Sequence, residues 1–461
     1  MLFTVGEAAA AVGGTLRGVD PATPVTGVVI DSRATGPGDL FVALAGQNVD
    51  GHLFARDAAA KGAACVLVDP RRLPPGGDLP RIEVEQPLTA LGRLAAWYRK
   101  GFQVPTIGVT GSVGKTTTKE MIAAVLGRRG PVLKSFGNYN NEIGVPLSTF
   151  AWRPEHRAAV FELAMRARGD IKLLTDIVQP TMGVITKIGP THLEVLGSME
   201  AIAAAKAELI DALPESGVAV LNADDPLVAA MAGQAPGRVV LYGTGAEAEV
   251  RGQDPRPDGR FAFTFQLTTP AGSGRVRVPS PGAHLMTNAL AAAAVGWVMG
   301  LSVEETAKGL AAYQPAGPRL EIITLPGLTI LDDSYNAAPV SVKASLGALA
   351  QAAGSGRAIA VLGDMLELGS LAQEGHAEVG RAAAGTADYL FCYGPLMAHA
   401  AAAAREAGMP GENVRHYQDK ERLTADLLGL LRPGDTLLVK GSRSMDMGSI
   451  VTALRRDWRS R

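Results

Sequence analysis

The sequence predicts an α/β protein of three domains built on mostly parallel sheets. Two observations lead to this prediction. A β-branched strand at 106–110 runs through glycines directly into an amphipathic helix, and from residue 328 onwards strands alternate regularly with helices. The length of 461 residues leaves room for two to four separate cores. We expect the domains to span residues 1–103, 104–315 and 316–461.

The segment 106–118 has the context of a phosphate-binding loop, because a strand, a glycine-rich turn and a helix follow one another. Its glycines let successive backbone N–H groups point at one anion, and the helix N-terminus adds partial positive charge. Lys115 is then placed to reach the β- and γ-phosphates of a nucleotide, and the Thr116 hydroxyl to ligate magnesium. Val109 stands where the strict pattern has its first glycine. An ordinary strand-to-helix turn seldom ends in Gly-Lys-Thr-Thr, so the segment predicts a nucleotide site.

The first domain contains a strand at 28–30 that leads into Asp31-Ser32-Arg33. Ser32 and Arg33 at a strand end can bind a pyrophosphate or nucleotide, since the guanidinium fork matches phosphate oxygens. A surface salt bridge explains the arginine as simply, and the residues alone favour that explanation. Further strands are predicted at 40–44 and 65–68, with an alanine-rich helix between them.

The second domain carries an amide-rich turn and a strand that ends in a carboxylate. Residues 137–144 include Asn138 and Asn141, which suit sugar or peptide recognition, although such a stretch is usually only a turn. Glu162 ends the apolar strand 158–162, where an acid of a phosphate-loop fold commonly meets the metal on the nucleotide. A capping glutamate is an equally good interpretation.

Three further side chains of this domain are candidates because of where they lie. His192 follows the strand 183–186, at the edge where open α/β sheets bind ligands, although a loop histidine bonded to backbone is the alternative. Lys206 lies in an alanine-rich helix, where a plain surface lysine is the default interpretation. Asn288 opens a long alanine-rich helix and either contacts a base or caps the helix. Residues 245–280 alternate polar and apolar positions, which predicts hairpins.

The third domain begins beyond Pro315-Ala316-Gly317-Pro318. Each of its predicted strands is followed by a helix, which indicates a Rossmann-like, doubly wound parallel sheet. These strands span 328–333, 358–363, 389–393 and 436–441. No Gly-x-Gly-x-x-Gly occurs there, so we predict no dinucleotide site in this domain. Three strands end in polar runs, and three such ends on one rim predict a binding site.

Composition excludes several functional classes. The net charge of −1 gives no basic surface for nucleic acid. Cys65 and Cys392 lie in apolar runs, so we expect both to be buried free thiols, which fits a protein of a reducing compartment. The N-terminus lacks the pattern of a signal peptide, and the most apolar segment, 290–301, is too short to cross a bilayer. We therefore expect a cytoplasmic protein without membrane insertion.

Taken together, these motifs resemble the Mur ligase family of ATP-dependent, amide-bond-forming enzymes over essentially the whole chain. The loop at 110–116 matches the family's own form of the phosphate loop, which accounts for Val109. The remaining motifs follow in the family's order: Glu162, His192, Lys206, 222–226 and 284–288. Four stretches are most similar to the member that joins D-alanyl-D-alanine to UDP-N-acetylmuramoyl-tripeptide: 137–144, 332–336, 362–369 and 439–444. The Asp-Asn-Pro-Arg motif of the preceding, diaminopimelate-adding ligase is absent.

The resemblance implies a reaction in cytoplasmic peptidoglycan precursor synthesis. ATP phosphorylates a substrate carboxylate to an acyl phosphate, which the amine of D-alanyl-D-alanine then displaces. The implied cofactors are ATP and Mg²⁺, the implied substrates are UDP-N-acetylmuramoyl-tripeptide and D-alanyl-D-alanine, and the expected state is a monomer. The work of the protein would be charge neutralisation and positioning.

The resemblance also implies roles for particular residues. Lys115, Glu162, His192 and Lys206 would be catalytic. Nucleotide contacts would come from Gly111, Ser112, Gly114, Lys115, Thr116, Thr117, Asn288, Arg319 and Asp333. Thr116 and Glu162 would bind a first magnesium, and His192 and a carbamylated Lys206 a second. Ser32 and Arg33 would lie near the uridine diphosphate, and Asn138 and Asn141 near the substrate.

Two other interpretations of the motifs stay open. One is a sister enzyme, either another Mur-type ligase or a folylpolyglutamate-type ligase. The other is a phosphate-loop switch or motor that uses ATP for conformational work. No guanine-selective Asn-Lys-x-Asp motif occurs, and the residues favour a ligase.

Overall fold

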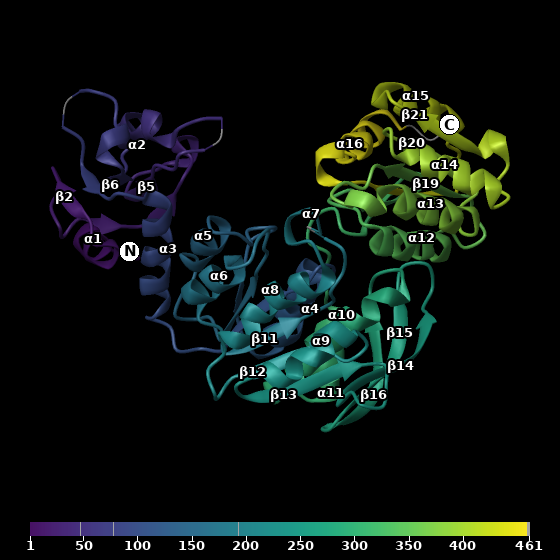
Figure 1. The fold of residues 1–461 in the computed structure, drawn as a ribbon, viewed down its shortest axis with the longest axis horizontal. Helices are drawn as coiled ribbons and strands as arrows, with labels where there is room; N and C mark the ends of the chain where they lie inside the picture. Colours follow the sequence, from purple (N-terminus) through teal and green to yellow (C-terminus); the bar gives the residue numbers. More distant parts are fainter. Residues whose placement is uncertain (47, 77, 192, 459–461) are drawn as a thin grey trace.

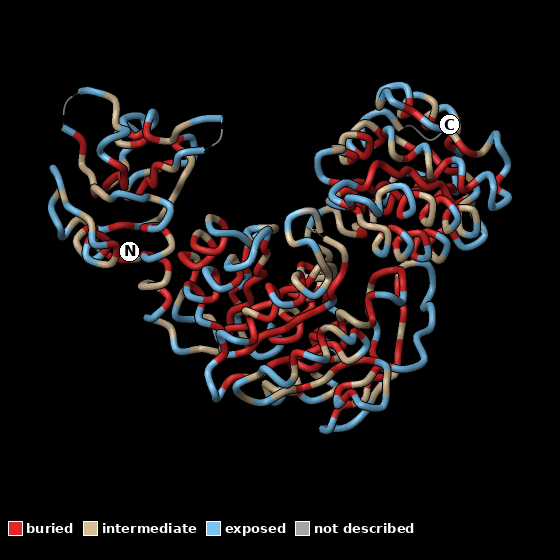
Figure 2. Tube along the Cα trace, in the orientation of Figure 1, coloured by how far each residue is buried: buried red, intermediate tan, exposed pale blue. Residues whose placement is uncertain are grey.

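The structure, a computed structural model, describes residues 1–458 except 47, 77 and 192. The chain forms three lobes arranged as an open crescent, each built on its own sheet (Figure 1). The first and third lobes form the two arms, and the second lobe lies between them. Buried segments gather in the middle of each lobe (Figure 2), and one cluster of buried residues extends from the sheet of the first lobe into that of the second.

The first lobe has a five-stranded sheet of order β2-β7-β6-β5-β4 and a separate two-stranded sheet, β1-β3. Its strands are β1 (Phe3–Thr4), β2 (Thr15–Arg17), β3 (Pro24–Val25), β4 (Gly27–Val29), β5 (Asp39–Val42), β6 (Cys65–Val68) and β7 (Arg81–Glu83). Its helices are α1 (Val5–Val12), α2 (Ala55–Ala60) and α3 (Pro87–Arg99). Strands β4 to β7 run parallel, and β2 pairs antiparallel with β7.

The second lobe has a nine-stranded sheet of order β16-β15-β14-β13-β12-β11-β8-β10-β9. Its strands are β8 (Thr106–Thr110), β9 (Val132–Lys134), β10 (Ala158–Glu162), β11 (Met182–Ile185), β12 (Val218–Asn222), β13 (Arg238–Gly243), β14 (Val250–Pro257), β15 (Phe263–Thr269) and β16 (Gly272–Val278). The pairs from β9 to β14 are parallel, whereas β14, β15 and β16 form antiparallel hairpins, as the alternation at 245–280 predicts.

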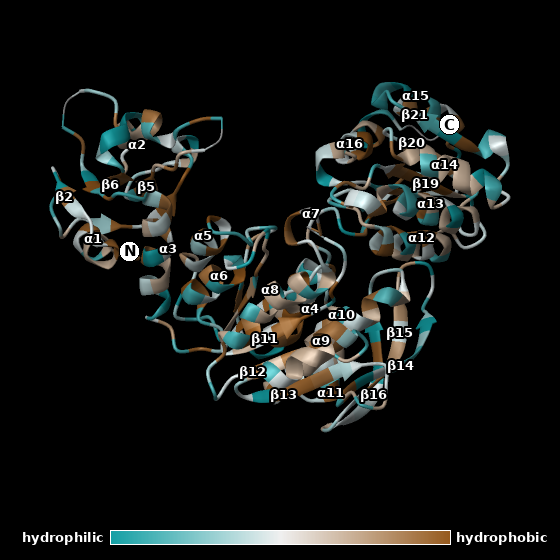
Figure 3. Ribbon diagram, in the orientation of Figure 1, coloured by the Kyte–Doolittle hydropathy of each residue, from teal (hydrophilic) through white to brown (hydrophobic). Residues whose placement is uncertain are grey.

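Helices cover both faces of this sheet. They are α4 (Lys115–Leu126), α5 (Gly144–Thr149), α6 (Asp170–Val178), α7 (Leu193–Leu196), α8 (Met199–Asp211), α9 (Pro226–Ala229), α10 (Met286–Val298) and α11 (Val303–Ala311). Hydrophobic segments lie in the interior of this lobe (Figure 3). Residues 289–294 of α10 are all fully buried, and its alanines let it pack closely on α4. This packing fixes the helix that begins at the phosphate loop.

The third lobe is the predicted doubly wound sheet, of order β17-β18-β22-β19-β20-β21. Its strands are β17 (Glu321–Leu325), β18 (Leu328–Asp333), β19 (Ala358–Gly363), β20 (Tyr389–Tyr393), β21 (Val414–Tyr417) and β22 (Asp435–Lys440). Its helices are α12 (Pro339–Ala353), α13 (Ala372–Ala384), α14 (Met397–Glu406), α15 (Lys420–Leu430) and α16 (Gly448–Asp457). The four predicted strands are confirmed.

Two strands at the edges of this sheet were not predicted. β17 pairs antiparallel with β18 through a turn at Pro326-Gly327, and β21 is a short strand with two polar residues. Edge strands lack the continuous apolar runs of buried parallel strands, so their sequences give a weaker signal. Within the described residues, no helix is long and apolar enough to cross a membrane.

Arg99, at the end of α3, joins the first lobe to the second. Its side chain is buried and donates to the carbonyl of Val178 at 2.7 Å and to the Thr106 hydroxyl at 3.0 Å. The guanidinium also lies 5.0 Å from the centre of the Trp152 ring. Every one of these partners belongs to the second lobe, so this buried cation ties the end of α3 to the second lobe, beside the apolar contacts that the two lobes share.

We expect Arg99→Met to destabilise this junction by about 1–3 kcal/mol, because buried acceptors lose their donor. A lowered midpoint of thermal unfolding measures the effect. Arg93→Met, on an exposed position of the same helix, is the matched control and should change the unfolding free energy by less than about 0.5 kcal/mol. Equal midpoints for the two variants would contradict the role of Arg99.

Candidate functional site

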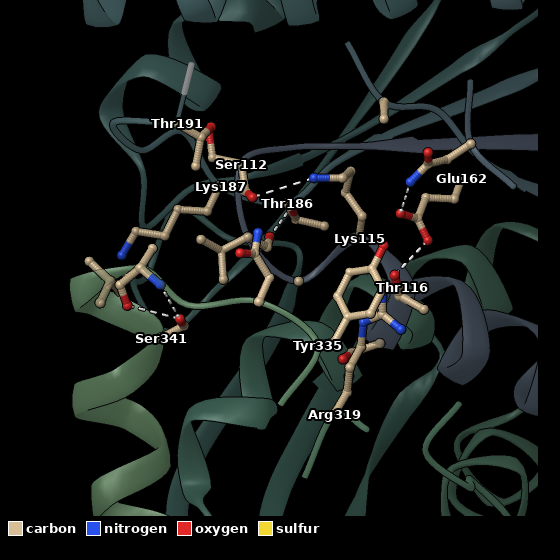
Figure 4. A pocket seen from close by; sticks show the side chains of 18 of the residues that line it. Ser112, Lys115, Thr116, Glu162, Thr186, Lys187, Thr191, Arg319, Tyr335 and Ser341 are labelled. Carbon is tan, nitrogen blue, oxygen red and sulfur yellow. Dashed lines mark hydrogen bonds between the residues drawn. The ribbon is translucent and has the colours of Figure 1, made fainter. Parts of the chain in front are cut away.

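A cavity of about 1530 Å³ opens between the second and third lobes and contains most of the predicted site residues. Its walls come from the phosphate loop, the amide-rich turn, the end of β10 and the start of α10, all in the second lobe. The third lobe contributes the ends of β18 and β22 and the start of α12. Figure 4 shows the phosphate-loop side chains opposite Tyr335 and Ser341.

The phosphate loop has two positions, 111 and 114, that only glycine can occupy. Gly111 has φ +147° and Gly114 has φ +89°, both in the region that favours glycine. A Cβ at Gly111 would lie 1.9 Å from the Thr186 hydroxyl, and a Cβ at Gly114 would lie 2.4 Å from Nδ2 of Asn288. The loop therefore needs glycine for its backbone conformation and for the closeness of its neighbours.

Lys115 folds back over this loop. Its ammonium donates to the carbonyl of Gly111 at 2.7 Å and lies 3.4 Å from that of Ser112 (Figure 4). Burial lowers the pKa of Lys115, while Glu162 opposes that shift and Arg319 adds to it. The loop thus presents a cation and a helix N-terminus to the same part of the cavity, which suits a polyphosphate.

Glu162 is buried at the end of β10 and uses both carboxylate oxygens. The Thr116 hydroxyl donates to Oε2 at 2.6 Å, and the Asn140 amide donates to Oε1 at 2.7 Å. Hydroxyl and carboxylate oxygens are the hard ligands that Mg²⁺ prefers, so this pair fits the metal. Among the described residues no three His, Cys, Asp or Glu side chains gather into a metal cluster. Mg²⁺ usually takes few protein ligands together with substrate phosphates and water, which agrees with a two-residue contribution.

Lys206 is not a surface lysine. Its side chain on α8 is only 2% exposed, and burial, together with nearby Lys115, holds its pKa well below the ordinary value. The default interpretation of the sequence is therefore wrong for this residue. His192, the other expected ligand of the second metal, lies outside the described residues.

The third lobe contributes charged and aromatic groups to the cavity. The Arg319 guanidinium lies 3.7 Å from the centre of the Tyr335 ring (Figure 4), and the Arg443 guanidinium lies 5.7 Å from the same centre. Asp333 accepts from the Lys440 ammonium at 2.6 Å, and the same ammonium donates to the Asn336 carbonyl at 2.9 Å. Register places Asp333 directly opposite Lys440, so the polar ends of β18 and β22 form one rim.

Other predicted residues have local partners in the structure. Asn288 donates to the Gly114 carbonyl at 3.2 Å and to the Thr118 hydroxyl at 2.9 Å, so its amide fastens α10 to the phosphate loop. Asn141 accepts from the Gly144 amide at the start of α5 at 2.9 Å, and both Asn138 and Asn141 line the cavity. Ser112 donates to the Gly189 carbonyl at 3.0 Å, and Thr117 lines the cavity.

Ser32 and Arg33 lie in the first lobe and do not line this cavity. Ser32 is buried, and the Arg33 guanidinium pairs with Asp31 at 2.7 Å on an exposed surface. That pairing lowers the pKa of Asp31 to about 2. The structure therefore separates these two residues from the rest of the predicted set.

Several residues that shape the site were not predicted individually. Asn222 donates to the Thr186 carbonyl at 2.7 Å, and Asp225 accepts from the Ile188 amide at 2.8 Å, so both hold the loop beside Ser112. The sequence marks 222–226 only as an acidic turn, and it does not reveal which neighbouring loop the turn contacts. Asn140 and Lys440 were missed for the same reason, since their partners are distant in the chain.

Comparison with known families gives three matches along the chain. The Mur ligase family catalytic domain matches residues 24–99, the Mur ligase middle domain 109–296, and the Mur ligase glutamate ligase domain 318–443. The chain belongs to the Mur ligase family. This Mur ligase is 39% identical over 436 residues to the UDP-N-acetylmuramoyl-tripeptide–D-alanyl-D-alanine ligase of Bacillus subtilis (strain 168), with 94% of this chain and 93% of the relative covered.

Solved structures agree with this assignment. A crystal structure of MurF from Acinetobacter baumannii matches this Mur ligase with a TM-score of 0.88 at 32% identity, covering 99% of both chains. MurF ligase from Thermotoga maritima, solved in complex with ADP, matches with a TM-score of 0.80 at 27% identity, covering 94% of this chain and 98% of that one. The family and the three-domain α/β fold expected from the sequence are confirmed.

We expect Gly114→Ala to weaken ADP binding by this Mur ligase about tenfold or more. The left-handed backbone costs a non-glycine residue about 1–2 kcal/mol, and the new Cβ must displace Asn288. Isothermal titration calorimetry measures the change. Gly127→Ala is the matched control, because Gly127 ends the same helix with ordinary φ and nothing lies near its Cβ position. Wild-type affinity in folded Gly114→Ala would show that the loop geometry is not needed.

Proposed function

We infer that this Mur ligase joins D-alanyl-D-alanine to UDP-N-acetylmuramoyl-tripeptide in an ATP-dependent, ADP-forming reaction of peptidoglycan precursor synthesis. The observation that carries this inference is one cavity in which a phosphate loop faces the polar rim of a doubly wound lobe. Relatives of this activity match the chain over nearly its whole length. The protein would act in the cytoplasm, as a monomer, with domains near 1–103, 104–315 and 316–461.

The chemistry requires activation of a carboxylate, because oxide is too poor a leaving group for direct attack by an amine. The substrate carboxylate takes the γ-phosphoryl group of ATP, which breaks the bond to ADP and gives an acyl phosphate. The amine nitrogen of the dipeptide then attacks the acyl carbon, phosphate leaves, and the nitrogen loses a proton. Lys115 and Arg319 supply positive charge for the phosphoryl group as it transfers.

Thr116 and Glu162 would hold the magnesium ion of the nucleotide. Their oxygens are 2.6 Å apart and belong to the phosphate loop and to the neighbouring strand β10, so both groups face the same place. Bound magnesium neutralises phosphate charge and orients the triphosphate. The chain's own contribution is to keep two oxygen ligands in position before the substrate arrives.

Lys206 would act as a carbamate. Burial and nearby Lys115 hold the pKa of Lys206 well below its ordinary value, which favours the neutral amine, and a neutral amine reacts with CO₂ to give a carbamate and release a proton. The carbamate is an anion with oxygen ligands, whereas an ammonium would repel a cation. We propose that this group, with His192, binds a second magnesium near the acyl phosphate.

The dipeptide would bind at the third-lobe rim. D-alanyl-D-alanine has a carboxylate and two methyl groups, so its site needs a cation beside apolar surface. Arg443 is exposed on the cavity wall, makes no ion pair within the described part of the chain, and shares that wall with Val340 and Leu366. Ser32 and Arg33 would contact the uridine diphosphate in the first lobe, away from this chemistry.

One assay tests the inferred function. Phosphate release from ATP is measured with UDP-N-acetylmuramoyl-tripeptide, with and without D-alanyl-D-alanine. Release that depends on both substrates supports the inference, and release with another amine or with a folate acceptor would indicate a sister ligase. Nucleotide hydrolysis that needs no acceptor would indicate a phosphate-loop switch or motor.

We expect Lys206→Ala to be nearly inactive and to regain part of its activity in acetate, which supplies a carboxylate at the vacated position. Steady-state phosphate release at increasing acetate concentration measures the rescue. Lys172→Ala, at an exposed lysine of the same lobe, should keep wild-type activity and show no acetate effect. Full activity of Lys206→Ala without acetate would argue against the carbamate.

We expect Arg443→Met to raise KM for D-alanyl-D-alanine about tenfold or more, since a charge-assisted hydrogen bond contributes about 1.5–3 kcal/mol. KM for ATP should stay near its wild-type value. Arg432→Met, at an exposed arginine of the same lobe outside the cavity, is the control. A KM for ATP that rises while the dipeptide KM stays constant would place Arg443 at the nucleotide instead.

A further inference from the structure

Lys119 is a fully buried cation that the mechanism above does not use. It lies on α4, one turn beyond Lys115, and its side chain is 0% exposed. Burying an ammonium costs several kcal/mol unless all of its donors are satisfied. The network around this lysine therefore calls for a physical explanation.

The Lys119 ammonium has a partner for each of its three donors. It donates to the carbonyls of Ser135 at 2.8 Å and Gly137 at 3.0 Å, and it pairs with Glu120 at 3.2 Å. Two of these partners belong to the loop 135–140, which leaves β9 and passes beside the end of β10. One buried side chain thus fastens the helix of the phosphate loop to this second loop.

The loop 135–140 contacts the end of β10, around Glu162, through both its first and its last residue. At its start, the Ser135 hydroxyl accepts from the Glu162 amide at 3.1 Å. At its end, Asn140 accepts from the Ala164 amide at 2.8 Å and donates its side-chain amide to Glu162 Oε1 at 2.7 Å. The remaining carboxylate oxygen accepts from Thr116. The carboxylate is therefore oriented by Asn140 on one side and by α4 on the other.

We propose that Asn140 and Lys119 are positioning residues that fix the Glu162 carboxylate for the metal ion at the nucleotide. Asn140 acts by its direct hydrogen bond, and Lys119 acts by holding the loop that carries Asn140. Partners of metal ligands are typically worth 10–100-fold in metal affinity. This proposal rests on the proposed function, in which Glu162 and Thr116 hold magnesium.

The test separates metal binding from nucleotide binding. Mn²⁺ is titrated by electron paramagnetic resonance into protein saturated with a non-hydrolysable ATP analogue, and calorimetry with ADP in EDTA gives the metal-free nucleotide affinity. In Asn140→Ala and Lys119→Met, Mn²⁺ should bind about 10–100-fold more weakly, with little change in metal-free ADP affinity. The apparent KM for Mg²⁺ in phosphate release should rise in parallel.

Lys134→Met is the matched control for Lys119→Met. Lys134 also pairs with Glu120, but it is half exposed and holds no part of the loop 135–140. Its loss should leave Mn²⁺ affinity unchanged. If Lys119→Met does not fold, Asn140→Ala alone still tests the proposal. Asn140 lies at the cavity surface and is not a core residue, so this variant should fold.

The outcomes distinguish this proposal from the proposed function. If the unmodified protein binds Mn²⁺ and Asn140→Ala binds it with the same affinity, the positioning role is overturned and the proposed function is not. A parallel loss of metal-free ADP affinity also overturns it, because the residues would then support the nucleotide site as a whole. A wild-type protein in which nucleotide creates no Mn²⁺ site overturns the metal assignment, and the positioning role with it.

Discussion

The hydrogen bond between Thr116 and Glu162 is the contact on which the catalytic architecture depends. It joins the first turn of α4 to the end of β10, and parallel pairing of β10 with β8 puts Glu162 opposite Val109 at the start of the phosphate loop. Because adjacent parallel strands end at the same edge of a sheet, a carboxylate on one strand reaches a loop from the next. Packing of α10 against α4 and the Asn288 contact to Gly114 keep that loop in place.

Three lysines of one lobe show how environment decides the role of a residue type. Lys115 lies near Glu162, which favours its charged form, and it folds over a loop built for anions. Lys119 is buried yet has an acceptor for every donor. Lys206 is buried beside another cation, which favours the neutral amine. The same side chain therefore folds over an anion-binding loop at one position, fastens a helix to a loop at another, and is held toward its neutral form at a third.

In the third lobe, the order of the strands in the sheet brings the residues of its half of the site together. The last strand, β22, inserts between β18 and β19, so that two strand ends more than a hundred residues apart in the sequence meet as the pair Asp333 and Lys440. This rim closes the cavity opposite the phosphate loop, and Arg319 with Tyr335 reaches back from the junction between the lobes. The crescent shape leaves the first and third lobes apart on either side of the second (Figure 1).

The sequence by itself determined the α/β class, the parallel strands of the third lobe, the phosphate loop and the family, because these depend on local periodicity and on contiguous motifs. It also placed Glu162 and the polar runs of the third lobe at strand ends, where the structure has them. Only the tertiary structure decided that Lys206 is buried, that Asn140 rather than a neighbouring asparagine contacts Glu162, and that Lys119 fastens α4 to the loop 135–140. Burial and pairing of this kind depend on strand order and register, which bring together residues whose separation along the chain carries no local signal.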